Sequence, residues 1–236
     1  MNRIEQVFGA ARVLLPVIHP IGREEALEAV GIVHGAGVKG IFLIDQGMGE
    51  DEVLELVLEA RARFPSLWIG LNLLGRAPAE ALAVALAHCD GRIDGIWADH
   101  AGIAEGASSQ PDAEAFVAAR GARGWDGLYF GGVAFKYQRE VAPAELARAA
   151  SLAAAYMDVI CTSGPGTGQA ADVEKLRTMH GALADSALAL ASGVSEANVH
   201  IYMPYVQAFL VGTGIEARFG VIDEKKLKRL LRAIQA

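Results

Sequence analysis

The sequence has only two cysteines in 236 residues, Cys89 and Cys161, and they do not form a Cys-x-x-Cys pair. A zinc or redox framework built on paired cysteines is therefore excluded. The sequence also lacks a His-Glu-x-x-His motif, and its first apolar run has no His-x-His. A metal site built from His19, Asp45 and Asp99 would be possible but generic. We expect the protein to use neither a metal nor an organic cofactor.

Long apolar runs and an excess of positive charge are missing too. The run VLLPVIHPIG is interrupted by Pro16 and His19 and is too short to cross a membrane. The polar segment MNRIEQVFGAAR does not resemble a signal peptide. We therefore expect a soluble, cytoplasmic protein without membrane insertion. The net charge of −7 argues against nucleic acid as a partner.

The composition that is present is typical of a globular protein, with 53% hydrophobic and 21% charged residues. No linker or low-complexity segment interrupts the chain, so we expect one domain over residues 1–236. The one basic run, Lys225 to Arg232, carries leucines at helical spacing and is expected to be the solvated face of a last helix. A homodimer is the first oligomer to test for, because two-fold dimers are the commonest.

Eight short, almost continuous apolar runs indicate parallel strands that are buried on both faces. Helical patterns separate them, and each strand with its helix spans roughly 30 residues. Eight such units predict an α/β fold, a (β/α)8 barrel of eight parallel strands; a doubly wound open sheet is the rival. The predicted strands are 13–19, 40–45, 68–74, 95–101, 128–134, 158–164, 188–194 and 208–214, and the predicted helices are 24–34, 51–63, 78–88, 112–120, 143–155, 172–184 and 223–234, with a short helix over 196–202.

Polar residues gather where these apolar runs end, which is where a barrel of this kind carries its chemistry. Polar groups in apolar strands are costly unless they have partners, so their concentration at one end predicts a site. We expect Asp99 to act as an acid or base, and Lys136 to stabilise negative charge or form a Schiff base. Further candidates are His19 and Asn72 for catalysis, and Asp45, Thr162 and Ser163 for substrate binding.

Each of these candidates has a structural alternative. His19 can be a satisfied buried histidine, Asn72 can link neighbouring strand ends, and Lys136 can be an ordinary exposed lysine. Asp99 and His100 are adjacent on one strand, so their side chains point to opposite faces. If Asp99 faces the helices, His100 takes the inward position.

Two consecutive predicted strands end in small residues, Ser192-Gly193 and Gly212-Thr213. The loops after strands seven and eight of a barrel, with a short helix, are a frequent phosphate site. Glycine lets backbone N–H groups approach an anion, hydroxyls add donors, and a helical turn near Gly214 would add its own N–H groups. We expect these four residues to bind phosphate without Lys or Arg. The alternative is that both glycines only make tight turns.

The glycine-rich run SGPGTGQ, residues 163–169, follows the sixth predicted strand. It lacks the lysine of a Walker loop and the glycine spacing of a dinucleotide fingerprint. It is therefore either a loop that touches the ligand or a plain turn.

Several segments resemble one known family. The stretches DVICTSGPGTGQAADVEKLR, LASGVSEANV and FLVGTGIE, together with VIHPIG, GLNLL and the Phe-Lys at Lys136, are similar to the BtpA/SgcQ-like barrel family. The likeness covers most of the chain and is strongest over residues 158–223. The chain departs from the family at the predicted mouth: Ile44-Asp45 replaces a Glu-Asn pair, Gly132 an Asp, and Glu216 a Lys.

The resemblance implies a barrel with a phosphate-type site, in a family that includes a protein linked to photosystem assembly. Two hypotheses follow. The first is a lyase, isomerase or transferase that acts on a small phosphorylated ligand, such as a sugar phosphate or phosphoribosyl compound. The second is a non-catalytic assembly or regulatory factor that retains the barrel pocket. The absence of carboxylates at Ile44 and Gly132 favours this second hypothesis.

Overall fold

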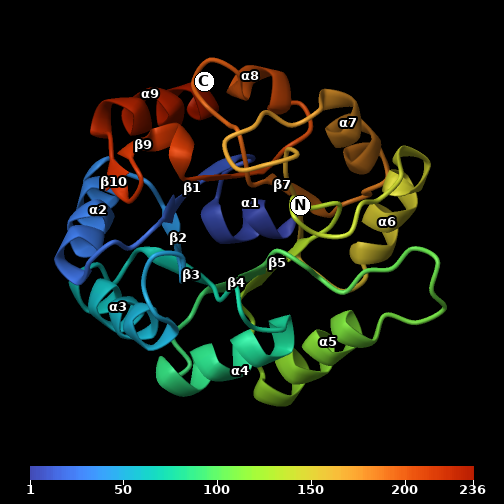
Figure 1. Cartoon of the computed structure of the whole chain (residues 1–236), viewed down its shortest axis with the longest axis horizontal. Coiled ribbons are helices and arrows are strands. Elements are labelled where there is room, and N and C mark those ends of the chain that lie inside the picture. The colour runs from blue at the N-terminus through green and yellow to red at the C-terminus, as the bar shows by residue number, and fades with distance from the viewer.

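The computed structural model describes residues 1–236 and shows a closed barrel of parallel strands inside a ring of helices (Figure 1). The strands follow one another around the barrel in chain order, and β8 pairs with β1 to close it. The predicted (β/α)8 barrel is confirmed. Its strands are β1 (Val13–Ile18), β2 (Gly40–Ile44), β3 (Trp68–Asn72), β4 (Gly95–Ala98), β5 (Leu128–Gly132), β6 (Val159–Thr162), β7 (Ala187–Leu190) and β8 (Ala208–Val211).

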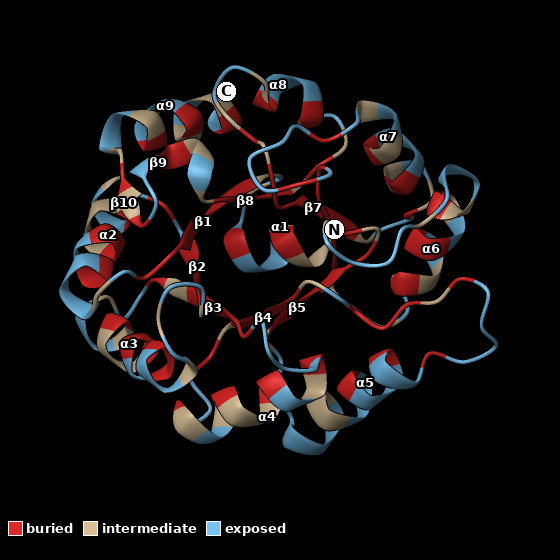
Figure 2. Cartoon of the chain, in the orientation of Figure 1, coloured by how far each residue is buried: buried red, intermediate tan, exposed pale blue.

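Each observed strand ends before its predicted end, and the residues that follow it begin the loops. The helices bury their inner sides against the strands and expose their outer sides, as Figure 2 shows. None of them combines the length and the apolar content needed to cross a membrane. They are α2 (Arg23–Gly35), α3 (Glu50–Arg63), α4 (Pro78–His88), α5 (Pro111–Arg123), η1 (Pro143–Glu145) with α6 (Leu146–Ala153), α7 (Val173–Gly181), α8 (Val199–Tyr202) and α9 (Glu224–Gln235).

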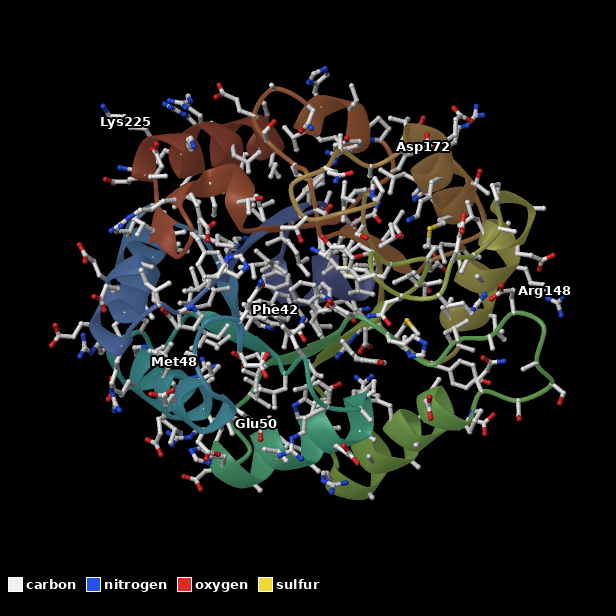
Figure 3. The ribbon with its side chains drawn as sticks, in the orientation of Figure 1. Phe42, Met48, Glu50, Arg148, Asp172 and Lys225 are labelled. Atoms are coloured by element: carbon white, nitrogen blue, oxygen red, sulfur yellow. The ribbon has the colours of Figure 1, made fainter.

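Aromatic side chains fill the interior of the barrel. Phe42 lies edge-to-face with Trp68 and Phe130, with ring centroids 5.2 and 5.1 Å away. Gly70 makes room for this arrangement, since a Cβ atom there would lie 2.3 Å from the Phe42 ring. Figure 3 shows Phe42 near the centre of the ring of strands. Side chains therefore fill the barrel interior below the C-terminal ends of the strands.

One helix and one hairpin were not predicted from the sequence. Helix α1 (Arg3–Phe8) lies in the centre of the ring in Figure 1, and its residues Ile4 and Phe8 join the interior cluster. After β8, the turn η2 (Thr213–Ile215) leads into a hairpin of β9 (Glu216–Arg218) and β10 (Val221–Ile222). The predicted helix over 196–202 is reduced to α8, with turns before it.

We expect Phe8→Ala to lower the free energy of unfolding by about 3–5 kcal/mol, because it empties space inside the barrel. Phe8 is 5% exposed and lies edge-to-face with Trp68 at 5.4 Å. The neighbouring Val7, which is 41% exposed, provides the control: Val7→Ala is expected to change stability by less than about 0.5 kcal/mol. Urea unfolding measures both. Equal effects would show that α1 does not close the barrel interior.

Candidate functional site

A cavity of about 190 Å³ opens at the C-terminal ends of the strands. Its apolar lining comes from inward-facing strand residues, among them Val17, Ile44, Trp97 and Leu210. Its polar lining comes from the residues that follow the strands. These are His19, Gln46, Asp99, Lys136, Tyr137, Thr167, Ser192 and Thr213.

Asp99 occupies the inward position at the end of β4 and lines the cavity. His100 is exposed on the other side, where its Nδ1 accepts a hydrogen bond from the N–H of Gly102 at 3.2 Å. Although both residues follow β4, only Asp99 lines the cavity, as expected from the alternation of side chains along an extended chain. Asn72, at the end of β3, is 1% exposed and donates through Nδ2 to Asp99 Oδ1 at 3.1 Å. The structure thus joins two of the predicted catalytic residues directly.

The pKa of Asp99 lies above its ordinary value because burial penalises the charged carboxylate. The hydrogen bond from Asn72 and the positive charge of Lys136 act in the opposite direction, and the negative charge of Asp45 adds to the rise. Asp99 therefore retains a proton at a higher pH than an exposed aspartate does. A buried carboxyl with a raised pKa suits a group that donates or accepts protons.

Lys136 also lines the cavity, where it is half-buried and its Nζ lies 5.7 Å from the centroid of the Phe135 ring. Ser163 fixes the main chain at this point: its Oγ accepts a hydrogen bond from the Lys136 N–H at 2.7 Å and donates to the Gly164 carbonyl at 2.8 Å. The Ser163 hydroxyl is therefore engaged within the loops. It does not line the mouth cavity.

The two other substrate-binding candidates are also engaged within the protein. Thr162 is fully buried, and its Oγ1 donates to the carbonyl of Ala134 at 3.2 Å. Asp45 accepts a hydrogen bond from the N–H of Leu74 at 2.9 Å. Neither side chain lines the cavity. His19, Asp45 and Asp99 do not gather into a metal-ligating cluster.

His19 lies on the opposite wall and has a partner that the sequence analysis did not find. Its Nδ1 is 2.7 Å from Glu216 Oε1, and the two residues are 8% and 5% exposed. Phe219, from the turn of the β9–β10 hairpin, stacks on the imidazole with ring centroids 4.9 Å apart. Glu216 is 197 positions away in the chain, so only the closure of the barrel reveals the pair.

The glycines after β7 and β8 are required by contacts within the protein. Gly193 has a φ of +63°, and a Cβ atom there would lie 2.1 Å from the carbonyl oxygen of Gln169. A Cβ atom on Gly212 would lie 2.4 Å from the imidazole Cε1 of His19. Ser192 ties the same loop down, because its Oγ donates to the carbonyls of Gly166 and Gln169 at 2.9 and 3.1 Å. Close packing therefore explains why these positions are small.

The same loops nevertheless offer free donors to the cavity. The N–H groups of Ser192, Gly193, Val194 and Gly212 have no acceptor within the chain, and all four residues line the cavity. Thr213 is exposed, its hydroxyl makes no hydrogen bond within the chain, and it begins the turn η2 near the position predicted for one. Most backbone N–H groups in folded proteins have a partner, so four free ones around one cavity form a potential anion site.

Two further residues near the mouth were not predicted from the sequence. Tyr137 receives a hydrogen bond from the Thr167 N–H at 3.0 Å and so links the loops after β5 and β6. Lys175, on α7, donates through Nζ to the carbonyls of Ala134 and Ser163, and burial lowers its pKa to about 8. In the sequence, Lys175 looks like any lysine in the first turn of a surface helix.

We expect Asn72→Ala to raise the pKa of Asp99 further, because it removes a hydrogen bond that favours the charged carboxylate. Gln46→Ala provides the control, since Gln46 lines the same cavity but makes no hydrogen bond to Asp99. Titration of the Asp99 carboxyl carbon by NMR measures the pKa in each variant. An unchanged or lower pKa in Asn72→Ala would contradict this assignment.

Several solved structures share the fold at low sequence identity. Phosphoribosyl anthranilate isomerase from Thermus thermophilus is 17% identical, with a TM-score of 0.64 over 95% of this chain and 98% of that one. Tryptophan synthase from Mycobacterium tuberculosis is 16% identical, with a TM-score of 0.69 over 100% and 99%. Orotidine 5'-monophosphate decarboxylase from Methanocaldococcus jannaschii, in complex with the inhibitor BMP, is 14% identical, with a TM-score of 0.68 over 96% and 100%.

No curated protein matches the sequence. The family model described as the BtpA family matches residues 56–236, which include β3 to β8 and every cavity residue discussed above except those before position 56. The resemblance noted in the sequence is thereby confirmed. The chain belongs to the BtpA family and has the fold of a TIM barrel.

Proposed function

We propose that the protein is an enzyme that binds a small phosphorylated metabolite at the mouth of the barrel, with the phosphate held by the loops after β7 and β8. The observation that carries this proposal is the set of free N–H groups at Ser192, Gly193, Val194 and Gly212 beside the free hydroxyl of Thr213. Backbone N–H groups and hydroxyls are the donors that bind phosphate in many barrels.

The charges around the cavity are consistent with a phosphate held at the loops after β7 and β8. Lys136 is the one Lys or Arg among the lining residues, and it follows β5, whereas the proposed phosphate donors follow β7 and β8. The phosphate is thus bound by neutral donors, and Lys136 remains available to stabilise negative charge that develops elsewhere on the ligand. Asp99 supplies the proton-transferring carboxyl, and Asn72 positions it.

The comparisons support a phosphorylated substrate by analogy of fold alone. The names of two structural neighbours, phosphoribosyl anthranilate isomerase and orotidine 5'-monophosphate decarboxylase, describe enzymes whose substrates carry a phosphate group. The small cavity of about 190 Å³ favours a compact metabolite. We propose that the reaction is that of a lyase, an isomerase or a transferase.

We expect Thr213→Asp to weaken the binding of inorganic phosphate at least tenfold, because it places a carboxylate where the anion binds; each tenfold change is about 1.4 kcal/mol. Thr213→Val, which removes only the hydroxyl, is expected to weaken binding about 2- to 10-fold. Ser151→Asp, on the exposed side of α6, carries the same change of charge and is expected to leave binding unchanged. Isothermal titration calorimetry measures all three.

Valine at Gly193 or Gly212 is a poor probe of this site, because its side chain would overlap Gln169 or His19 whether or not an anion binds. If phosphate binds wild type and Thr213→Asp equally, the anion lies elsewhere and the proposal is wrong.

Turnover separates the enzyme from a non-catalytic assembly or regulatory factor. Gly132, where a carboxylate is missing, has a packing reason: a Cβ atom there would lie 1.9 Å from the Asp99 carbonyl oxygen. The absence of a carboxylate at position 132 therefore does not favour the non-catalytic alternative. We expect a panel of sugar phosphates to include a substrate whose turnover falls at least 100-fold in Asp99→Asn. Phosphate binding without turnover of any of them would favour the non-catalytic factor.

A further inference from the structure

The two nitrogens of the His19 ring have different surroundings. Nδ1 lies against Glu216 Oε1, whereas Nε2 makes no hydrogen bond within the chain, and the residue lines the cavity. The side chain as a whole is 10% exposed. Phosphate binding by the loops after β7 and β8 does not account for a buried imidazole at the cavity with one nitrogen that has no partner.

Glu216 determines which nitrogen carries the proton. Its Oε1 also accepts a hydrogen bond from the Gly220 N–H at 3.3 Å, and its main-chain carbonyl accepts one from Lys226 Nζ at 2.8 Å. An ionised carboxylate can only accept hydrogen bonds, so we assign the proton of this pair to Nδ1. In a neutral imidazole, a proton on Nδ1 leaves Nε2 with a lone pair.

The ring cannot easily turn to exchange its nitrogens. Phe219 stacks on one face of the imidazole, and Gly212 packs so closely against Cε1 that no Cβ atom would fit. The hairpin that carries both Glu216 and Phe219 is tied to α9 through Lys226. These contacts fix the orientation of the ring as well as its tautomer.

We propose that His19 presents the lone pair of Nε2 to a hydroxyl group of the phosphorylated ligand, and that Glu216 is the positioning residue that holds His19 in this state. This inference rests on the proposed function, because the ligand is the one whose phosphate lies at the loops after β7 and β8. Gly212 belongs to those loops and touches the imidazole, so the recognised hydroxyl stands on a carbon close to the phosphate ester.

The two sides of the cavity therefore differ in their hydrogen-bonding groups. On the β3 and β4 side, burial raises the pKa of the Asp99 carboxyl above its ordinary value. On the β1 and β8 side, His19 is an acceptor. A ligand between them meets the Asp99 carboxyl on one side and a hydrogen-bond acceptor on the other, so the site favours hydroxylated phosphate esters over simple alkyl phosphates.

The tautomer can be tested without any ligand. Long-range ¹H–¹⁵N NMR distinguishes a protonated from an unprotonated ring nitrogen. We expect wild-type His19 to carry its proton on Nδ1, and Glu216→Leu to lose this preference. Glu224→Leu, an exposed change on α9, provides the control and is expected to behave as wild type. A wild-type spectrum with the proton on Nε2 would overturn the proposal even if Glu216→Leu fails to fold.

The ligand preference is tested with three probes: inorganic phosphate, n-propyl phosphate and glycerol 3-phosphate. We expect wild type to bind glycerol 3-phosphate roughly tenfold more tightly than n-propyl phosphate, and Glu216→Leu to lose this preference while it retains affinity for inorganic phosphate. Equal affinity of wild type for the two esters would overturn the hydroxyl assignment. Failure of all three probes to bind would instead overturn the proposed function, and the tautomer measurement would still stand.

Discussion

The pairing of β1 with β8 is the contact on which the site depends. It aligns Pro16 with Val211 and so brings His19, three residues later, beside Gly212. From there the chain turns back through η2 into the β9–β10 hairpin, which places Glu216 against His19. Residues from the two ends of the sequence thereby form one wall of the mouth, and an open sheet would leave them apart.

Much of the fold and part of the site could be predicted from the sequence, because both follow from local periodicity. Near-continuous apolar runs at a regular repeat indicated eight buried parallel strands. Alternation along a strand allowed only one of Asp99 and His100 to face inward, and the structure shows that it is Asp99. Polar residues at strand ends indicated the mouth, although Thr162 and Ser163 turned out to bond to neighbouring loops.

The rest depends on contacts between distant segments, which periodicity does not encode. A glycine in a sequence shows that something approaches closely, but not whether it is a ligand or the protein itself. At Gly193 it is the main chain of Gln169, and at Gly212 it is the ring of His19. Both explanations for the glycines hold at these loops: packing requires the glycine, and the N–H groups without partners belong to residues that line the cavity.

A crystal structure with inorganic phosphate or a sugar phosphate tests the phosphate site most directly. We predict a phosphate group within hydrogen-bond distance of the N–H groups of Gly193, Val194 and Gly212 and of the Thr213 hydroxyl. The rest of a sugar phosphate should then extend between His19 and Asp99. A phosphate group bound instead beside Lys175, with the loops after β7 and β8 contacting only water, would contradict the assignment of the anion site.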